Sequence, residues 1–437
     1  MLEKIAEYFE FEKYNTNFRI ETLAGITTFM TMAYIIFVNP QILSATGMDF
    51  GAVMAVMVAT CISSAIATLL MGVFARYPFA LAPGMGLNAY FTYGVCLGMG
   101  IDWRVALGAV FISGILFVIL TLTKIRTMIF NAIPNAIKYG TAVGIGLFIA
   151  FIGLKNAGII VESKATLVTL GNLLEPSTLL AMFGIFLTGI LLCRRIVGAI
   201  LWGIIITALI GMILGITPFP DGIVSMPPSI EPTFMKLDVV GALNLGLLTI
   251  VLSFFFVDLF DTLGTLSALS SQAGYLKDGK LPRAERALMS DSLGTVIGSI
   301  LGTSTVTTYI ESAAGIAVGG RTGFVSIIVA LLFLLALFFY PIVKVIPTYA
   351  TASALVVVGA LMMTCVKYID WDDISEAIPA FITLISIPLT FSIATGLALG
   401  FITYPILKVF SGKAKKVHWL VYVLAVAFAL RFVYLSG

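Results

Sequence analysis

Two aspartates lie inside a run of residues that is otherwise apolar enough to cross a membrane. Asp258 and Asp261 belong to the stretch from Phe254 to Leu266, and their spacing of three residues places them on one face of a helix. A charged side chain at the centre of a bilayer costs about 2.5–3.5 kcal/mol on insertion scales. That face must therefore look into protein or a water-filled cavity. We predict that it meets a transported solute, and that one of the two carboxylates takes up a coupling proton.

Further polar positions fall in two apolar segments that look interrupted. Glu311 is an acid in the stretch Gly302–Gly315, which also contains Thr308. Asn88 follows two glycines, and an asparagine can donate and accept hydrogen bonds at once. Each residue could instead serve the fold. The acids could bond a neighbouring hydroxyl group, Asn88 could satisfy broken backbone, and the threonine could bond a carbonyl oxygen.

The candidate site is rich in acids and poor in cations. No basic residue lies obviously at membrane depth beside the acids, since Lys138 and Arg321 fall near segment edges. This balance disfavours an anionic substrate and suits a cation or a ligand with N–H donors. The chain has no phosphate-cradling glycine loop and no His/Cys spacing for a metal. We therefore predict no enzyme, no bound cofactor and no metal, with H+ as the coupling ion.

The composition indicates the class of protein. The 437 residues are 60% hydrophobic and only 11% charged, and the mean hydropathy is +1.09. Soluble proteins typically carry about 25% charged residues. The apolar runs reach roughly the 20 residues that a spanning helix needs, and the strict alternation of barrel strands is absent. The sequence therefore predicts an all-α polytopic membrane protein, and the net charge of +3 gives no indication of nucleic-acid binding.

Fourteen or fifteen apolar segments follow one another along the chain. We place them at about 20–42, 52–75, 79–98, 104–123, 134–155, 176–193, 197–216, 240–271, 286–301, 303–319, 322–346, 349–366, 376–392, 394–410 and 417–435. The polar break at 217–238 leaves seven before it and seven or eight after. The last, 417–435, is either an extra span or an interfacial helix. An odd number before the break means that the halves enter the membrane in opposite orientation, which predicts a 7+7 inverted repeat.

Basic residues predict the orientation. With a cytoplasmic N-terminus they fall on one side, and the acidic linker with Asp221 and Glu231 falls outside; these basic residues are Arg76, Lys124, Arg126, Arg194, Arg195, Lys277 to Arg286, Arg321 and Lys408 to Lys416. The third and tenth segments carry the interruptions. Pro83 and two glycines weaken a helix in one, and β-branched and hydroxyl residues favour extended backbone in the other. Such backbone is tolerated at membrane depth only when it is buried or lines a cavity.

Four stretches together resemble the nucleobase–cation symporters of the xanthine/uracil permease superfamily, in the adenine–guanine–hypoxanthine branch. They are residues 24–34 (AGITTFMTMAY), 82–91 (APGMGLNAYF), 257–266 (VDLFDTLGTL) and 302–315 (GTSTVTTYIESAAG). The resemblance covers nearly the whole chain. It associates the family's eighth-segment acid with Asp258 or Asp261, and alignment on Gly264 favours Asp261. It associates the tenth-segment acid with Glu311, and the third-segment motif with Asn88 and Gly86.

The resemblance implies a domain plan. Residues 1–18 would form an N-terminal interfacial segment. The core domain would comprise 19–126 and 239–346, and the gate domain would comprise 127–216 and 347–437. The external linker would be 217–238. Short strands in segments three and ten would flank the site. Transport would occur by an elevator movement of the core against the gate, and the gate would form a homodimer. Some uracil-type relatives have a histidine where this chain has Thr265, so a proton role must fall to the carboxylates.

These observations predict a plasma-membrane importer of purine bases, namely adenine, guanine or hypoxanthine. One of the two aspartates with Glu311 would accept the ring N–H groups, and the other aspartate would take the proton. Asn88 and the freed amides of 84–88 and 303–310, with Gly86 and Thr308, would meet the ring acceptors. An anion exchanger of the same architecture is disfavoured by Glu311. A channel and, more weakly, a membrane enzyme are the remaining alternatives.

Overall fold

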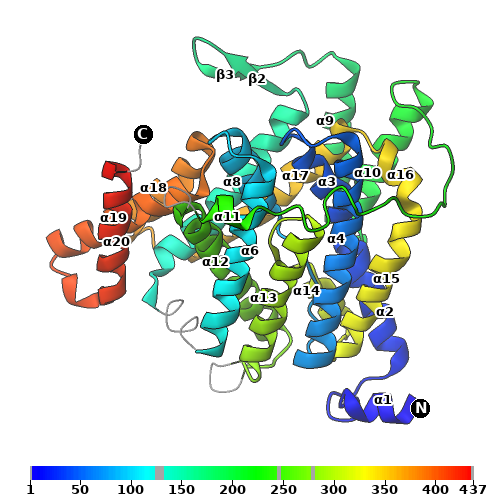
Figure 1. The fold of residues 1–437 in the computed structure, drawn as a ribbon, viewed down its shortest axis with the longest axis horizontal. Coiled ribbons are helices and arrows are strands. Elements are labelled where there is room, and N and C mark those ends of the chain that lie inside the picture. Colours follow the sequence, from blue (N-terminus) through cyan, green and yellow to red (C-terminus); the bar gives the residue numbers. More distant parts are fainter. Residues whose placement is uncertain (1, 124–131, 244–247, 277–280, 435–437) are drawn as a thin grey trace.

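The first half of the chain consists of long helices around one short buried strand, with a separate two-stranded hairpin. The computed structural model describes residues 2–123, 132–243, 248–276 and 281–434 (Figure 1). The elements before the linker are α1 (Leu2–Tyr8), α2 (Phe18–Met32), α3 (Ile35–Ser44), α4 (Phe50–Leu70), η1 (Met71–Ala75), β1 (Leu81–Pro83), α5 (Met85–Ala89), η2 (Tyr90–Leu97), α6 (Trp103–Leu122), α8 (Asn135–Asn156), β2 (Ile160–Ser163), β3 (Leu167–Leu170), α9 (Pro176–Cys193) and α10 (Ala199–Ile213).

The second half repeats this plan of long helices around one short strand. Its elements are α11 (Val239–Ala242), α12 (Leu248–Gln272), α13 (Ala284–Leu301), β4 (Val306–Thr308), α14 (Ser312–Val318), α15 (Gly323–Ala336), η4 (Leu337–Phe339), α16 (Tyr340–Val345), α17 (Thr348–Met362), η5 (Met363–Tyr368), α18 (Ile374–Thr390), α19 (Ile393–Phe410), η6 (Ala414–Lys416) and α20 (Trp419–Tyr434). The apolar run predicted from residue 240 is divided between α11 and α12, with 244–247 between them outside the described residues.

The two predicted interruptions are strands that pair with each other across the sequence. β1 and β4 are antiparallel, with Leu81 opposite Thr308 and Pro83 opposite Val306. Each strand leads into a short helix, α5 after β1 and α14 after β4. The two strand–helix units therefore run in opposite directions, as the inverted repeat predicts. The interrupted helices occur where the sequence places proline, glycine and β-branched residues.

Length and composition identify nine helices in the described part of the chain that could span a membrane. Three further apolar helices, α10, α18 and α20, are shorter. The sixteen residues of α20 extend about 24 Å, less than the roughly 30 Å of a bilayer core. The helical membrane protein is confirmed, whereas the count of fourteen or fifteen spans stays a prediction.

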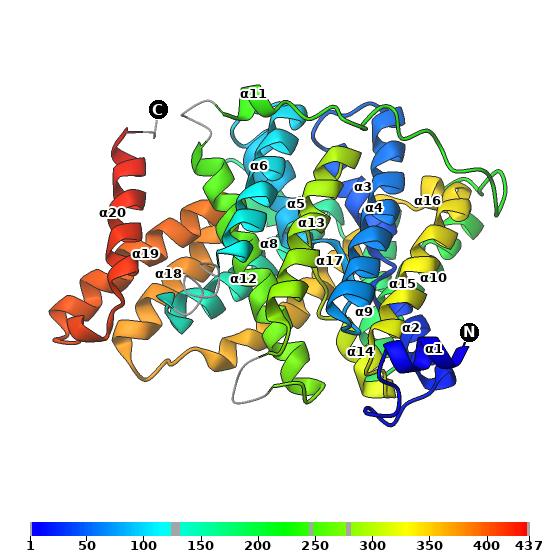
Figure 2. The same cartoon turned by 60° about the horizontal axis from the view of Figure 1, so that its bottom comes forward.

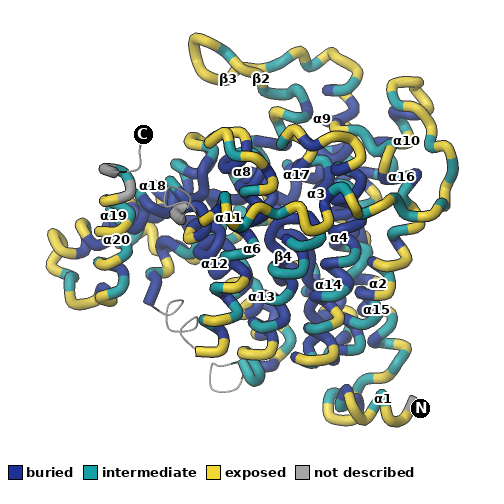
Figure 3. The backbone as a smooth tube through the Cα atoms, viewed as in Figure 1, coloured by how far each residue is buried: buried dark blue, intermediate teal, exposed yellow. Residues whose placement is uncertain are grey.

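The helices pack in two groups. α6 contacts both α12 and α13, and α4 contacts α13 and α15, which also packs on α2. In the other group α8 contacts α17, α18 and α19, and α9 contacts α10 and α17. Figure 1 shows α18–α20 at one end of the molecule and α1, α2 and α15 toward the other. Buried residues gather between the groups, while the β2–β3 hairpin, the linker and α1 are largely exposed (Figure 3).

The linker at 217–238 crosses one face of the molecule without helix or strand. In Figure 2 it runs along that face, while α1 and the junction of α19 and α20 lie toward the opposite face. Two backbone hydrogen bonds hold the linker in place. Met235 N–H donates to Ile300 O at 2.8 Å, and Asp238 N–H donates to Arg104 O at 2.8 Å. This placement agrees with a linker on the side opposite to the basic residues. Lys124, Arg126 and Lys277, which enter the same orientation prediction, lie outside the described residues.

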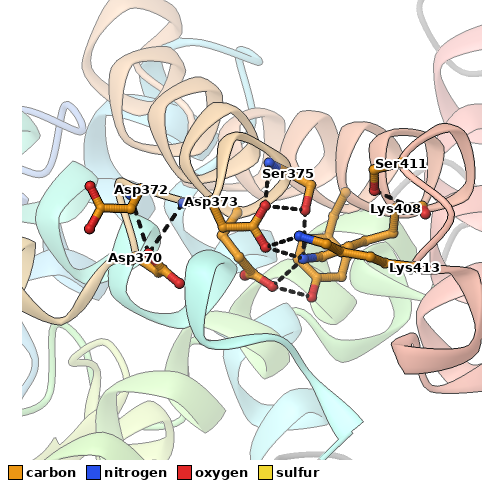
Figure 4. A network of polar contacts seen from close by, with 9 residues as sticks. Asp370, Asp372, Asp373, Ser375, Lys408, Ser411 and Lys413 are labelled. Atoms are coloured by element: carbon orange, nitrogen blue, oxygen red, sulfur yellow. Dashed lines mark hydrogen bonds and ion pairs between the residues drawn. The ribbon is translucent and has the colours of Figure 1, made fainter.

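A cluster of ionic contacts fastens the start of α18 to the end of α19 (Figure 4). Asp373 caps α18 by accepting the Ser375 backbone N–H at 3.0 Å. Lys413 lies 2.7 Å and Lys408 3.3 Å from the same carboxylate. Lys408 is buried and also contacts Glu376 at 2.7 Å. We call these five residues the α18–α19 clamp. It compensates a buried ammonium group, because an unpaired buried charge is strongly destabilising.

The clamp should make folding stability depend on pH. The hydrogen bond from Lys413, with help from Ser375, holds the pKa of Asp373 well below its usual range. A carboxyl group whose pKa is depressed in the folded chain contributes stability above its unfolded pKa of about 3.9, and loses it as the pH falls toward the folded pKa. Asp373→Asn should therefore lower the melting temperature of the detergent-solubilised protein at pH 7, and the gap to wild type should shrink below about pH 4.

The matched control is Asp221→Asn. Asp221 also contacts a lysine, Lys344 at 3.4 Å, but this pair is largely exposed and should contribute little. Melting curves by scanning fluorimetry at several pH values make the comparison. An Asp373→Asn gap of equal size at pH 3 and pH 7 would contradict the assignment.

Candidate functional site

The pairing of β1 with β4 places both interrupted segments beside α12. Gly84 N–H donates to Thr305 O at 3.0 Å, and Tyr309 N–H donates to Ala80 O at 2.9 Å, which extends the ladder at both ends. Thr68 of α4 bonds both the N–H and the carbonyl of Leu81. These contacts satisfy backbone groups that a broken helix would leave unpaired at membrane depth. The site therefore rests on two short strands whose backbones are hydrogen-bonded to each other and to α4.

Asp261 of α12 lies at the junction between β1 and α5. A Cβ atom added to Gly84 would lie 3.4 Å from Asp261 Oδ2 and only 2.6 Å from Thr307 Cγ2. Gly84 thus lets α12, β1 and β4 approach closely. Asp261 is partly exposed, unlike Asp258. It also lies near enough to Glu311 and Asp291 to interact with both electrostatically.

Glu311 is held at the start of α14 by a residue from the first segment. The Tyr34 hydroxyl donates to Glu311 Oε1 at 2.6 Å. Tyr34 is buried and lies at the break between α2 and α3. The Glu311 side chain keeps partial exposure, and its backbone carbonyl accepts from Thr31 at 3.4 Å. The carboxylate is therefore oriented by the protein, while the residue as a whole keeps partial exposure.

Asp258 belongs to a buried network of hydroxyl and carboxyl groups. The Thr262 hydroxyl lies 3.1 Å from Asp258 Oδ1 and 2.8 Å from Asp291 Oδ1. It is also 2.9 Å from the Thr307 hydroxyl of β4. Asp258, Asp291 and Thr262 are each fully buried. The network connects α12, α13 and β4, so the two aspartates, whose two roles the sequence left open between them, have different surroundings.

The other predicted site residues are tied more closely to the frame. Asn88 accepts a hydrogen bond from the Ser304 hydroxyl, so its side chain joins the two interrupted segments. A Cβ on Gly86 would lie 2.4 Å from Ile145 Cγ2, so this glycine serves the contact between α5 and α8. Thr308 is buried, and no residue in the described ranges bonds its hydroxyl. Because strand side chains alternate and Thr307 faces Thr262, Thr308 points to the other face.

Two residues of this region were not predicted from the sequence. Asp291 lies in the predicted segment 286–301 and is a further intramembrane acid, so a search for every acid in an apolar helix would have found it. Tyr34 ends the stretch 24–34 that carries part of the family resemblance, but an uncharged side chain in an apolar segment gives no signal of its own comparable to that of an acid. Its contact with Glu311 joins residues 277 apart in the sequence. In the described ranges no three His, Cys, Asp or Glu side chains form a group that could hold a metal ion.

Comparison with known proteins gives a consistent relationship. Residues 19–399 match the Permease family, in its xanthine/uracil group. A putative permease of Methanocaldococcus jannaschii is 82% identical over 100% of both chains. The guanine/hypoxanthine permease PbuG of Bacillus subtilis is 48% identical over 98% of this chain and 99% of that protein. The adenine permease AdeP of Escherichia coli is 44% identical over 100% of this chain and 97% of that protein.

A solved structure shares the fold at low sequence identity. The transmembrane domain of the cyanobacterial bicarbonate transporter BicA matches with a TM-score of 0.64 at 15% identity, over 88% of this chain and 97% of that chain. Likeness at this level shows the fold alone. The predicted multi-pass membrane protein is therefore confirmed by helices, fold and relatives together. On the length and strength of the sequence match, the chain belongs to the xanthine/uracil permease family.

Proposed function

We propose that this protein is a proton-coupled symporter that imports purine nucleobases. The observation that carries the proposal is the pair of partly exposed carboxylates, Asp261 and Glu311, set against the two interrupted segments. The names of its relatives, which include guanine/hypoxanthine and adenine permeases, support a purine as the substrate. We place the base beside these two acids.

A purine base matches the chemistry of this region. Its ring and exocyclic N–H groups are donors, and ionised carboxylates are strong acceptors. Tyr34 occupies one oxygen of Glu311 and leaves the other Glu311 oxygen for an N–H group. An anion would face acidic side chains instead, which disfavours the anion exchange suggested by the shared fold.

Asp261 suits contact with the base, and Asp258 suits the proton. The Thr262 hydroxyl has one proton but lies within bonding distance of two carboxyl groups. It can donate to only one of them. The second contact becomes favourable when the other carboxyl group itself holds a proton and donates it to Thr262. This count of donors supports a proton held by the pair of Asp258 and Asp291.

The packing of the helices supports an elevator movement. We propose residues 19–126 with 239–346 as the moving core and 127–216 with 347–437 as the gate. The candidate site residues lie on core elements, whereas α8 contacts α17, α18 and α19 within the gate. Gly86 of the core contacts Ile145 of α8 in the gate. Because glycine has no side chain, the core and the gate can pack closely at this point. Dimerisation through the gate stays a prediction.

Glu311→Gln should reduce purine uptake by at least tenfold, because it replaces the charged acceptor with a neutral amide of the same shape. Charge-assisted hydrogen bonds contribute roughly 1.5–3 kcal/mol, or about 10- to 150-fold. Tyr34→Phe should raise KM several-fold, since it removes the group that orients Glu311 but leaves the carboxylate. Uptake of radiolabelled hypoxanthine, guanine and adenine in cells without their own permeases measures both effects.

The matched control for these variants is Glu231→Gln in the exposed linker, which should transport like wild type at equal expression. A Glu311→Gln protein that reaches the membrane and transports at the wild-type rate would remove Glu311 from the site. A Tyr34→Phe protein with unchanged KM would remove its orienting role.

Asp258→Asn should separate transport from its driving force. Asparagine mimics the neutral acid, so exchange of labelled for unlabelled base across vesicles should continue while accumulation driven by an inward proton gradient is lost. Asp261→Asn should instead weaken binding of the base itself, with loss of both exchange and accumulation. If Asp258→Asn vesicles still concentrate hypoxanthine in proportion to the pH gradient, the proton is held elsewhere.

A further inference from the structure

A cavity lies outside the candidate substrate site, beside the first residues of α8 and α20 and next to Tyr404 of α19. It has a volume of about 680 Å³ and is lined by the start of α8, the end of α19 and the start of α20. Basic groups come from two sides, with Lys138 on α8 and Lys415, Lys416 and His418 before α20. No acidic side chain lines it among the described residues. The cavity therefore presents a concentrated positive charge.

The neighbouring acids are already compensated. Asp373 and Glu376 of the α18–α19 clamp contact Lys408 and Lys413, and Tyr404, which lines the cavity, donates to Glu376 at 2.8 Å. Figure 4 shows how closely these lysines are engaged with the clamp. Lys415 and Lys416 take no part in it, are exposed, and form no ion pair with any residue in the described ranges. Their charge is left for a ligand.

An apolar stripe begins at the edge of the same cavity. Trp419, Val423, Val426 and Leu430 of α20 are all strongly exposed. Their spacing of four, three and four residues places them on one face of the helix. Trp419 lines the cavity as well as starting the stripe. Tryptophan is typical of the border between headgroups and hydrocarbon. A molecule with an anionic head and apolar tails would contact both features at once.

We propose that this cavity binds the phosphate group of an anionic membrane lipid. The ammonium groups of Lys415, Lys416 and Lys138 contact the phosphate, and the acyl chains lie along the apolar stripe of α20. Basic pockets between membrane helices are suited to such headgroups, and each lysine near an anionic lipid contributes about 1 kcal/mol. Because the cavity touches α8 and α19, the lipid would fasten α20 to these two helices of the proposed gate.

Native mass spectrometry of the full chain in detergent tests the proposal by titration with lipids of identical acyl chains. Phosphatidylglycerol should bind at least tenfold more tightly than phosphatidylcholine. The double variant Lys415→Gln/Lys416→Gln should lose about 30-fold in affinity for phosphatidylglycerol, the equivalent of roughly 1 kcal/mol for each lysine. Lys138→Gln, which changes the opposite wall, should lose several-fold. Raised salt should weaken phosphatidylglycerol binding in the wild type.

The matched control is Arg194→Gln/Arg195→Gln, which removes two exposed charges after α9, away from the cavity. It should keep the wild-type affinity for phosphatidylglycerol. Equal affinity for the two lipids, or a Lys415→Gln/Lys416→Gln protein that still prefers phosphatidylglycerol, would overturn the proposal. Displacement of phosphatidylglycerol by inorganic phosphate at millimolar concentration would also overturn it, because the site would then take a soluble anion.

Discussion

The antiparallel pairing of β1 with β4 is the interaction on which the remaining structure depends. A helix broken inside a membrane protein leaves N–H and C=O groups that lipid cannot satisfy. Here each interrupted segment supplies hydrogen-bond partners for the other. Gly84 N–H donates to Thr305 O, and Tyr309 N–H donates to Ala80 O. Neither break could exist alone at this depth. The same pairing holds the two halves of the chain together and brings α5 and α14 to one place.

The pairing also explains why the acids differ from one another. Thr307 of β4 bonds Thr262 of α12, and this contact draws Asp258 and Asp291 into a closed network. Asp261 lies about one helical turn further along α12, beside Gly84, and stays partly exposed. Glu311 is oriented by Tyr34 from a distant segment. One frame thus produces two environments, one shut away from solvent and one open to a ligand.

The likeness to a bicarbonate transporter shows how far a fold can be separated from its chemistry. The crossed strands and inverted halves form a scaffold, and the side chains around them determine what can bind. In this chain those side chains are carboxylates and hydroxyl groups. Positive charge gathers instead in the cavity beside α20, outside the candidate substrate site.

Much of this architecture could be predicted from the sequence. Apolar runs of spanning length, interrupted at Pro83–Gly86 and at the β-branched run before Glu311, are local properties that hydropathy and backbone preference record directly. The sequence also identified Asp258, Asp261 and Glu311, because a charge inside an apolar run is costly wherever it finally lies. It could not separate Asp258 from Asp261, nor show the link between Tyr34 and Glu311. Those distinctions arise from contacts between residues far apart in the chain, and only the packed tertiary structure decides which side chain is enclosed and which remains open.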